Sequence, residues 1–254
     1  MSFKQILKYL LYWQIFILFV ISWSQNLLPL QKNFIGGGEQ ASFADPKPYI
    51  RNPHLYFRGN FDGVYYINIA RRGIGLYQEA FFPLYPKLIK SLYPVIKITV
   101  VSGSLISTFF FLIGLYYFQK LIALDASPNV AKWSTIALLL FPTSFFFTSV
   151  YTEGLFFCLS VSAFYFARTR HWWISALFVA LATYTRFVGI FLIPALFIEF
   201  LIQNPKFKWQ SLLPFLIMPL GLFVYMKYLH NVRGDALAFI HVQKNFGQGR
   251  SDKI

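Results

Sequence analysis

Long apolar runs, separated by short polar turns, dominate the chain. They cover residues at about 7–28, 95–118, 133–147, 155–167, 172–202 and 212–229. A helix of about twenty apolar residues is long enough to cross the hydrocarbon core of a bilayer. The pattern therefore predicts an all-α polytopic membrane protein.

The run at 172–202 is too long for one straight crossing. As a single helix it would extend about 46 Å at 1.5 Å per residue, against a hydrocarbon thickness of about 30 Å. We predict two short or partly re-entrant segments, hinged near Arg186 and Gly189. This split gives about seven transmembrane or re-entrant helices and brings the polar tail, 230–254, out on the same side as the first loop.

The segment 31–92 is a long first outer loop. Its apolar residues Val64, Ile67 and Ile69 recur with a spacing that favours an amphipathic helix lying in the interface. Pro83 and Pro86 predict extended, rigid backbone before the second span, and Pro142 predicts a kink near the end of the third. The glycine-rich "IGGGEQ" lacks the Lys of a phosphate loop and is interpreted as a flexible loop.

The composition places the whole chain, 1–254, in one membrane domain. It is 57% hydrophobic and only 13% charged, which excludes a soluble domain with a water-facing surface. The net charge is +14, but the Lys and Arg residues lie at the ends of apolar runs, where they meet lipid headgroups. A basic stripe for nucleic acid is missing, so membrane lipid is the expected partner. Cys158 stands alone and forms no disulfide within the chain.

The basic residues also predict the topology. With the N-terminus in the cytoplasm, the short inner loops are rich in Lys and Arg, as the positive-inside rule requires. These residues are Lys4, Lys8, Lys120, Lys132, Arg168, Arg170, Lys206 and Lys208. The scarce ionisable groups then gather on the outer, periplasmic or lumenal, face. They are Asp62, Glu79, Glu153, Arg186, Asp235 and His241.

Three carboxylates are candidates for chemistry, each with a simpler alternative. Asp62 precedes the interfacial helix, where it is either an N-cap or a general base for a hydroxyl. Glu79 is either a second catalytic carboxylate or a solvated interfacial side chain. Glu153 begins a span, and the helix dipole favours an anion there even without a function.

Three arginines are candidates for phosphate binding. Arg186 lies between two apolar segments, where a charge costs about 2.5 to 3.5 kcal/mol and is by default functional. A donor phosphate would justify that cost, because guanidinium binds phosphate in bidentate geometry. The alternative is a structural pair with Glu153. Arg71 and Arg72 flank the interfacial helix and are expected to bind either a specific phosphate or lipid headgroups in general.

Nothing in the chain requires a metal. The four histidines lack ligand spacing such as HExxH, so no metal site or cofactor is predicted, although a divalent cation at Asp62 and Glu79 stays open. A carboxylate base with a phosphate-binding arginine is what transfer of a sugar from a polyprenyl phosphate needs. The alternatives are a transporter or flippase of a lipid-linked substrate, and an inactive scaffold that serves a second subunit.

Five ordered motifs carry a family resemblance. "NFDGVYYINIARRG", "EAFFPLYP", "FPTSFFFTSVYTEGLFF", "ATYTRFVGI" and "GDALAFIHVQKNFGQGR" resemble, in that order, those of the phosphatidylinositol glycan class V mannosyltransferases and their bacterial relatives. The resemblance implies a GT-C membrane glycosyltransferase with a polyprenyl-phosphate mannose donor and a glycan or glycolipid acceptor. It implies Asp62 as the base, with Glu79 and Arg186 in other motifs. Residues expected to bind substrate are Tyr151, Glu153, Asp235 and Gln243.

The chain departs from the family pattern at two points. Phe61 stands where members usually have Trp before the first-loop Asp, which keeps an aromatic side chain. Members commonly continue with further spans after the last motif, whereas this chain stops at Ile254. We therefore expect a chain that is truncated at its C-terminus relative to the family.

Overall fold

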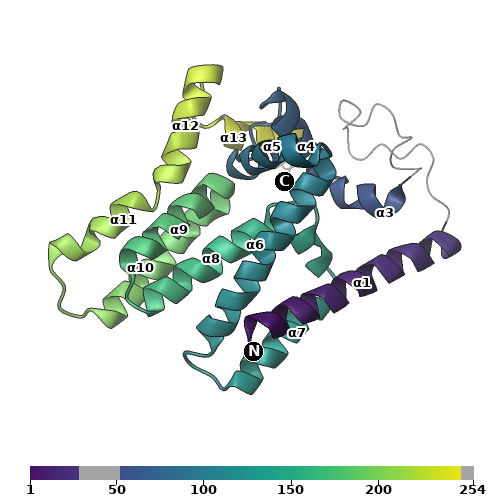
Figure 1. Cartoon of the computed structure of the whole chain (residues 1–254). Helices are drawn as coiled ribbons and strands as arrows, with labels where there is room; N and C mark the ends of the chain where they lie inside the picture. The colour runs from purple at the N-terminus through teal and green to yellow at the C-terminus, as the bar shows by residue number, and fades with distance from the viewer. Residues whose placement is uncertain (29–51, 247–254) are drawn as a thin grey trace, which may run out of the picture.

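The computed structural model describes residues 1–28 and 52–246, and the regular structure in these ranges is helical, without a strand. The part of the predicted first loop at 29–51, including "IGGGEQ", lies outside the described residues. The helices labelled in Figure 1 are α1 (Phe3–Leu27), α3 (Pro53–Tyr56), α4 (Asp62–Arg72), α5 (Leu84–Ile96), α6 (Thr99–Ile122), α7 (Pro128–Leu140), α8 (Glu153–Arg168), α9 (Trp172–Thr185), α10 (Leu192–Gln203), α11 (Leu213–Ile217), α12 (Leu220–Arg233) and α13 (Ala238–His241).

The centre of the bundle is the packing of α6 on α8 and of α8 on α9. Small residues allow these close approaches, as is common between membrane helices. A Cβ on Gly114 of α6 would lie 2.7 Å from the ring of Phe157 on α8. A Cβ on Gly154 of α8 would lie 2.6 Å from the carbonyl oxygen of Ser107 on α6. These two glycines therefore fix how near the central helices lie.

The predicted hinge in 172–202 is confirmed. Helix α9 ends at Thr185, Arg186 is extended (φ −152°, ψ 144°), and a short 3₁₀ helix, Phe187–Phe191, leads into α10. The rings of Trp172 and Phe200, at the far ends of α9 and α10, have centroids 5.1 Å apart, so the two helices are antiparallel. The chain therefore reverses at Arg186.

The reversal brings the two polar segments to one end of the bundle. Figure 1 shows α4, α5, α12 and α13 together at the end opposite the N-terminus. The Tyr225 hydroxyl on α12 donates to the carbonyl of Glu79, at 2.8 Å. The expected gathering of the first loop and the tail is confirmed.

Several predicted boundaries are wrong. Residues 84–96 form α5 instead of extended backbone, because Pro83 caps it and Pro86 lies in its first turn, where no N–H is needed. Lys97 is left-handed (φ 59°), so the second span begins at Thr99. Pro142 lies beyond α7 and kinks nothing, because α7 has already ended at Leu140.

The last predicted span is broken. The segments Trp209–Ile217 and Leu220–Arg233 meet at an angle of 43°. Pro219 lies between them and caps α12. A single straight helix over 212–229 is therefore excluded.

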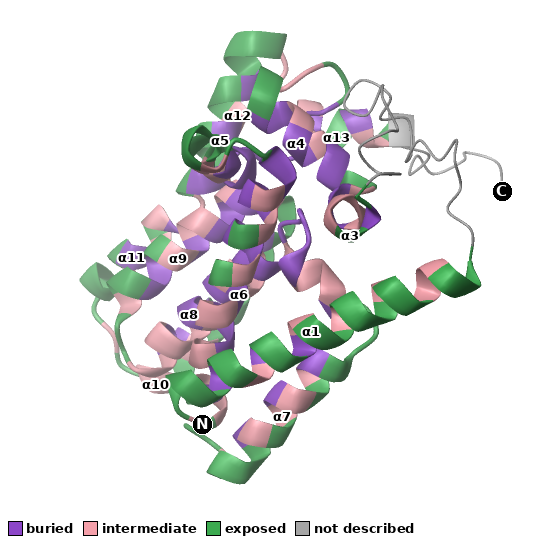
Figure 2. Ribbon diagram, turned by 45° about the vertical axis from the view of Figure 1, so that its right-hand side comes forward, coloured by how far each residue is buried: buried purple, intermediate pink, exposed green. Residues whose placement is uncertain are grey.

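Two described helices, α1 and α6, are long and apolar enough to cross a membrane, and the bent pair makes a third if it is counted as one span. Helix α1 is exposed along most of its length, as Figure 2 shows, and many of its exposed residues are large and apolar. An exposed apolar surface of this kind is suited to lipid. Helices α9 and α10 are apolar but shorter. The count of about seven crossings or re-entrant helices stays a prediction.

A substitution at Gly221 tests the packing of α12 on α9. A Cβ at this position would lie 2.0 Å from the carbonyl oxygen of Ala180, which is backbone and cannot move aside. We expect Gly221→Ala to cost about 1–3 kcal/mol of stability, as overpacking does, and to lower the unfolding temperature in detergent. Val232→Ala, at an exposed position of the same helix, is the control. Equal unfolding temperatures for the two variants would contradict this packing.

Candidate active site

Asp62 is the first residue of α4, and its carboxylate caps nothing. The N-cap is Phe61, which has φ 50° and ψ −123°, and no side chain bonds the first turn. The N-cap alternative for Asp62 is therefore wrong. Positive φ in a bulky residue is strained, and such strain gathers at functional sites. The strained residue directly precedes Asp62.

Arg58 holds the segment before Asp62 in place. It is buried, and its guanidinium donates to the Thr148 carbonyl at 3.1 Å and to the Gln14 side chain at 2.7 Å. Its own carbonyl accepts from the Val150 amide at 2.8 Å. Burial lowers the pKa of Arg58 to about 10. The cation thus ties the start of α4 to both α1 and the turn before α8.

Arg186 faces Glu153 across the gap between α9 and α8. Arg186 Nη1 donates to Glu153 Oε1 at 2.6 Å. The pair that sequence analysis gave as the alternative is therefore present. Guanidinium has five N–H donors, and within the described residues only Nη1 has an acceptor. The remaining donors are available to an anion in the pocket.

Asp62 differs from the other described carboxylates. Each of the others has an ion-pair partner, whereas Asp62 has none among residues 1–28 and 52–246. The pKa of Asp62 is raised above 3.8 by its burial and by the negative charge of Glu153, while Arg186 acts in the opposite direction. A carboxylate with a raised pKa is a better proton acceptor.

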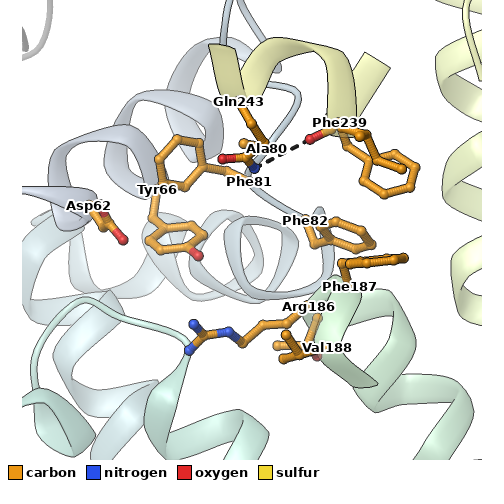
Figure 3. A pocket seen from close by; sticks show the side chains of 12 residues that line it. Asp62, Tyr66, Ala80, Phe81, Phe82, Arg186, Phe187, Val188, Phe239 and Gln243 are labelled. Atoms are coloured by element: carbon orange, nitrogen blue, oxygen red, sulfur yellow. Dashed lines mark hydrogen bonds between the residues drawn. The ribbon is translucent and has the colours of Figure 1, made fainter. Parts of the chain in front are cut away.

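Asp62 and Arg186 line one pocket, with a volume of about 540 Å³. Figure 3 shows Asp62, Tyr66 and the guanidinium of Arg186 on one side of it, and Phe82, Phe187 and Phe239 on the other. The pocket is therefore amphiphilic. It suits a molecule with a charged or sugar head and an apolar tail.

The other predicted residues lie in different surroundings. Glu79 is buried and binds Arg233, with Glu79 Oε1 2.7 Å from Arg233 Nε, and it does not line the pocket. Its neighbours Ala80, Phe81 and Phe82 do. The expectation of a solvated Glu79 is wrong, because Arg233 compensates its burial.

Tyr151, Asp235 and Gln243, which are expected from the sequence to bind substrate, lie in different surroundings. The buried Tyr151 donates to the Asn60 carbonyl at 2.9 Å, two residues before Asp62. Asp235 is half-buried and pairs with His241 at 2.7 Å, which lowers the pKa of Asp235. Gln243 lines the pocket, whereas Arg71 and Arg72 are exposed at the end of α4 and do not.

Sequence reasoning missed Arg58, Tyr66 and the aromatic wall. The signal for Arg58 was present, since a lone Arg in "FRGNFD" stands next to the candidate base. Tyr66 follows Asp62 by one helical turn and therefore shares its face. A cluster of three or more metal-ligating side chains is not found among the described residues.

The fold and the pocket define a helical membrane protein with an amphiphilic, carboxylate-bearing site at one end of its bundle. The family model described as mannosyltransferase (PIG-V) matches residues 3–213, and the chain belongs to this family. The predicted family is thereby confirmed, and the last of the five motifs lies beyond the matched residues. The match contains Asp62, Glu153 and Arg186 but ends before α12 and α13. No curated protein and no solved structure gives a significant match.

The charges around Asp62 predict how the activity should depend on pH. If Asp62 is the base, it must be deprotonated to act, and its raised pKa predicts an acidic limb of kcat/KM above the range of an ordinary Asp. We expect Glu153→Gln to move this limb to lower pH, because it removes the negative charge that raises the pKa and leaves Arg186 unpaired. The pH profile of kcat/KM measures the shift. Asp125→Asn, which is outside the pocket lining and pairs with Arg168, should leave the limb in place. An upward shift in Glu153→Gln would refute the assignment.

Proposed function

We propose that this pocket transfers mannose from a polyprenyl-phosphate donor to a hydroxyl of a lipid-linked or glycan acceptor. Membership of the family establishes a membrane mannosyltransferase in general. The observation that carries the finer proposal is the position of Asp62, the described carboxylate without an ion pair, in the same pocket as Arg186.

The proposed reaction uses the two sides of the pocket. The Asp62 carboxylate takes the proton of the acceptor hydroxyl, and the acceptor oxygen forms a bond to the anomeric carbon of mannose. The bond from that carbon to the donor phosphate breaks, and the electron pair leaves with the polyprenyl phosphate. The free N–H groups of Arg186 stabilise the negative charge that develops on the phosphate.

The aromatic side of the pocket is proposed to bind the first isoprene units. Phe187 and Phe239 have ring centroids 5.4 Å apart and both line the pocket. Phe187 is also 39% exposed, so the wall continues to the surface of the protein. This continuity favours a donor whose tail remains in the membrane.

The other residues support the site in our proposal. Tyr151 fixes the loop before Asp62 through the Asn60 carbonyl, and Gln243 offers an amide to the substrate. Glu79 and Arg233 anchor the wall at 80–82, and a direct catalytic role of Glu79 stays a prediction. Arg71, Arg72 and Asp235 are proposed to meet lipid headgroups and acceptor from outside the pocket.

We further propose that the pocket opens to the outer face of the membrane, with the N-terminus in the cytoplasm. Figure 1 supports a common inner end, because the start of α1, the turn from α6 to α7 and the turn from α10 to α11 lie away from α4 and α5. These segments carry Lys4, Lys120 and Lys206. Basic residues at one end are typical of the cytoplasmic side.

Donor choice tests the proposed function. The purified chain in liposomes is supplied either with polyprenyl-phosphate [³H]mannose or with a mannose nucleotide, together with a glycolipid acceptor. We expect transfer from the lipid-linked donor alone, because the pocket has an apolar wall and a single arginine for phosphate. Transfer from the nucleotide, or equal transfer by Asp62→Asn, would contradict the proposal.

A further inference from the structure

A second cavity, of about 280 Å³, lies beside the active site but shares no lining residue with it. It is bounded by the end of α4, by α5, by the last turn of α9 and by α12. Tyr184 faces this cavity, whereas Thr185 and Arg186 line the active site. The end of α9 therefore separates two sites.

Two lysines give this cavity a positive rim. Lys87 and Lys90 are one turn apart on α5, so their side chains lie on the same face, and both are exposed. The Lys87 ammonium donates to the Tyr184 hydroxyl and lies 5.1 Å from the centroid of its ring. Tyr184 thus holds the Lys87 ammonium at the rim of the cavity.

The lysines have no carboxylate to neutralise them among the residues that the structure describes. Five of the six described acidic side chains are ion-paired with arginines or a histidine, and the sixth, Asp62, lines the other pocket. Arg233, which donates to the Ile74 carbonyl at the cavity edge, is neutralised by Glu79. The rim therefore keeps two uncompensated positive charges.

The inner surface of the cavity is apolar and continues along α12. Val224 and Tyr228 line the cavity and are 55% and 43% exposed. Leu220 and Phe223, at helical spacing on the same face, are 47% and 54% exposed. An apolar strip below a pair of cations has the shape of a phospholipid binding site, with the headgroup at the rim and the chains on the strip.

We propose that this cavity binds an anionic phospholipid. Lys87, Lys90 and the Tyr184 hydroxyl bind the phosphate, and an acyl chain lies on the exposed face of α12. A free phosphate ion would use the rim but gain nothing from the strip, so the lipid is the favoured occupant. This inference concerns a site other than the proposed transfer site and holds whichever sugar is transferred.

Native mass spectrometry of the purified protein with added phosphatidylglycerol tests the proposal. We expect one retained lipid, and we expect its affinity to fall about thirtyfold in Lys87→Gln/Lys90→Gln, since each interfacial lysine contributes about fivefold. The matched control is Lys206→Gln/Lys208→Gln, which removes the same charge from exposed residues at the turn from α10 to α11. Lys87→Arg/Lys90→Arg should retain the lipid.

Two further arms identify the ligand. Phosphatidylcholine should be retained less than phosphatidylglycerol, because it lacks the net negative charge. Val224→Trp, which fills the apolar part without altering the rim, should also release the lipid. Unchanged retention in Lys87→Gln/Lys90→Gln, an equal loss in the control variant, or full displacement by inorganic phosphate would overturn the proposal.

Discussion

Asp62→Asn is expected to lower kcat by about 10²- to 10⁴-fold, the usual contribution of a general base. The substitution keeps the size of the side chain and removes only its ability to accept the proton. No hydrogen bond or ion pair of the described residues is lost, because the Asp62 carboxylate makes none. The unfolding temperature should therefore stay within about one degree of the wild type.

The measurement is initial-rate transfer from polyprenyl-phosphate [³H]mannose at saturating donor. Asp125→Asn is the matched control, because Asp125 is exposed, pairs with Arg168 and does not line the pocket. Asp62→Glu should retain part of the rate, since it keeps a carboxylate at a changed distance. If Asp62→Asn transferred mannose at the control rate, another residue would have to be the base.

Arg186→Gln is expected to have the second largest effect. The guanidinium lines the pocket and is half-buried against Glu153. The substitution removes the cation that binds the phosphate of the donor. The same cation stabilises the negative charge that develops on this phosphate during transfer. We expect a higher KM for the donor together with a fall in kcat of about 10²- to 10³-fold, as for other electrostatic stabilisers.

The alternative role of Arg186, as a structural partner of Glu153, makes a different prediction. If the pair only stabilises the fold, Arg186→Gln and Glu153→Gln should lower the unfolding temperature alike and leave the KM of folded protein unchanged. If Arg186 binds phosphate, Glu153→Gln should leave the donor KM nearly unchanged, because the cation remains. Kinetics and unfolding of the two variants together separate these roles.

The sequence was most informative where simple physical limits apply. The run at 172–202 exceeds the thickness of a bilayer, which predicted a break, and the polar interruption "TYTRFVG" placed the hinge near Arg186 and Gly189. Asp62 stood out because carboxylates are rare in so apolar a chain. Its place at the start of a helix followed from the spacing of Val64 and Ile67.

Partners distant in sequence could not be predicted in the same way. Glu79 finds Arg233, and Arg58 finds Gln14 and Thr148, only because the chain folds back on itself. The prediction of extended backbone at Pro83 and Pro86 failed for a local reason. A proline is compatible both with the first turn of a helix and with extended backbone, so the sequence alone does not distinguish the two. The end of α5 at Lys97 could not be predicted either. Lys97 adopts a left-handed conformation there, and a Lys in the sequence does not indicate such a conformation.

Binding of the donor to the two active-site variants tests the central claim most directly, because it separates phosphate binding from proton transfer. Labelled polyprenyl-phosphate mannose is titrated against wild type, Asp62→Asn and Arg186→Gln in the same membranes. The account predicts that Asp62→Asn binds the donor as tightly as the wild type but transfers mannose at least about a hundredfold more slowly, whereas Arg186→Gln binds the donor at least about tenfold more weakly. Wild-type affinity in Arg186→Gln, or lost binding in Asp62→Asn, would contradict the assignment of base and phosphate site.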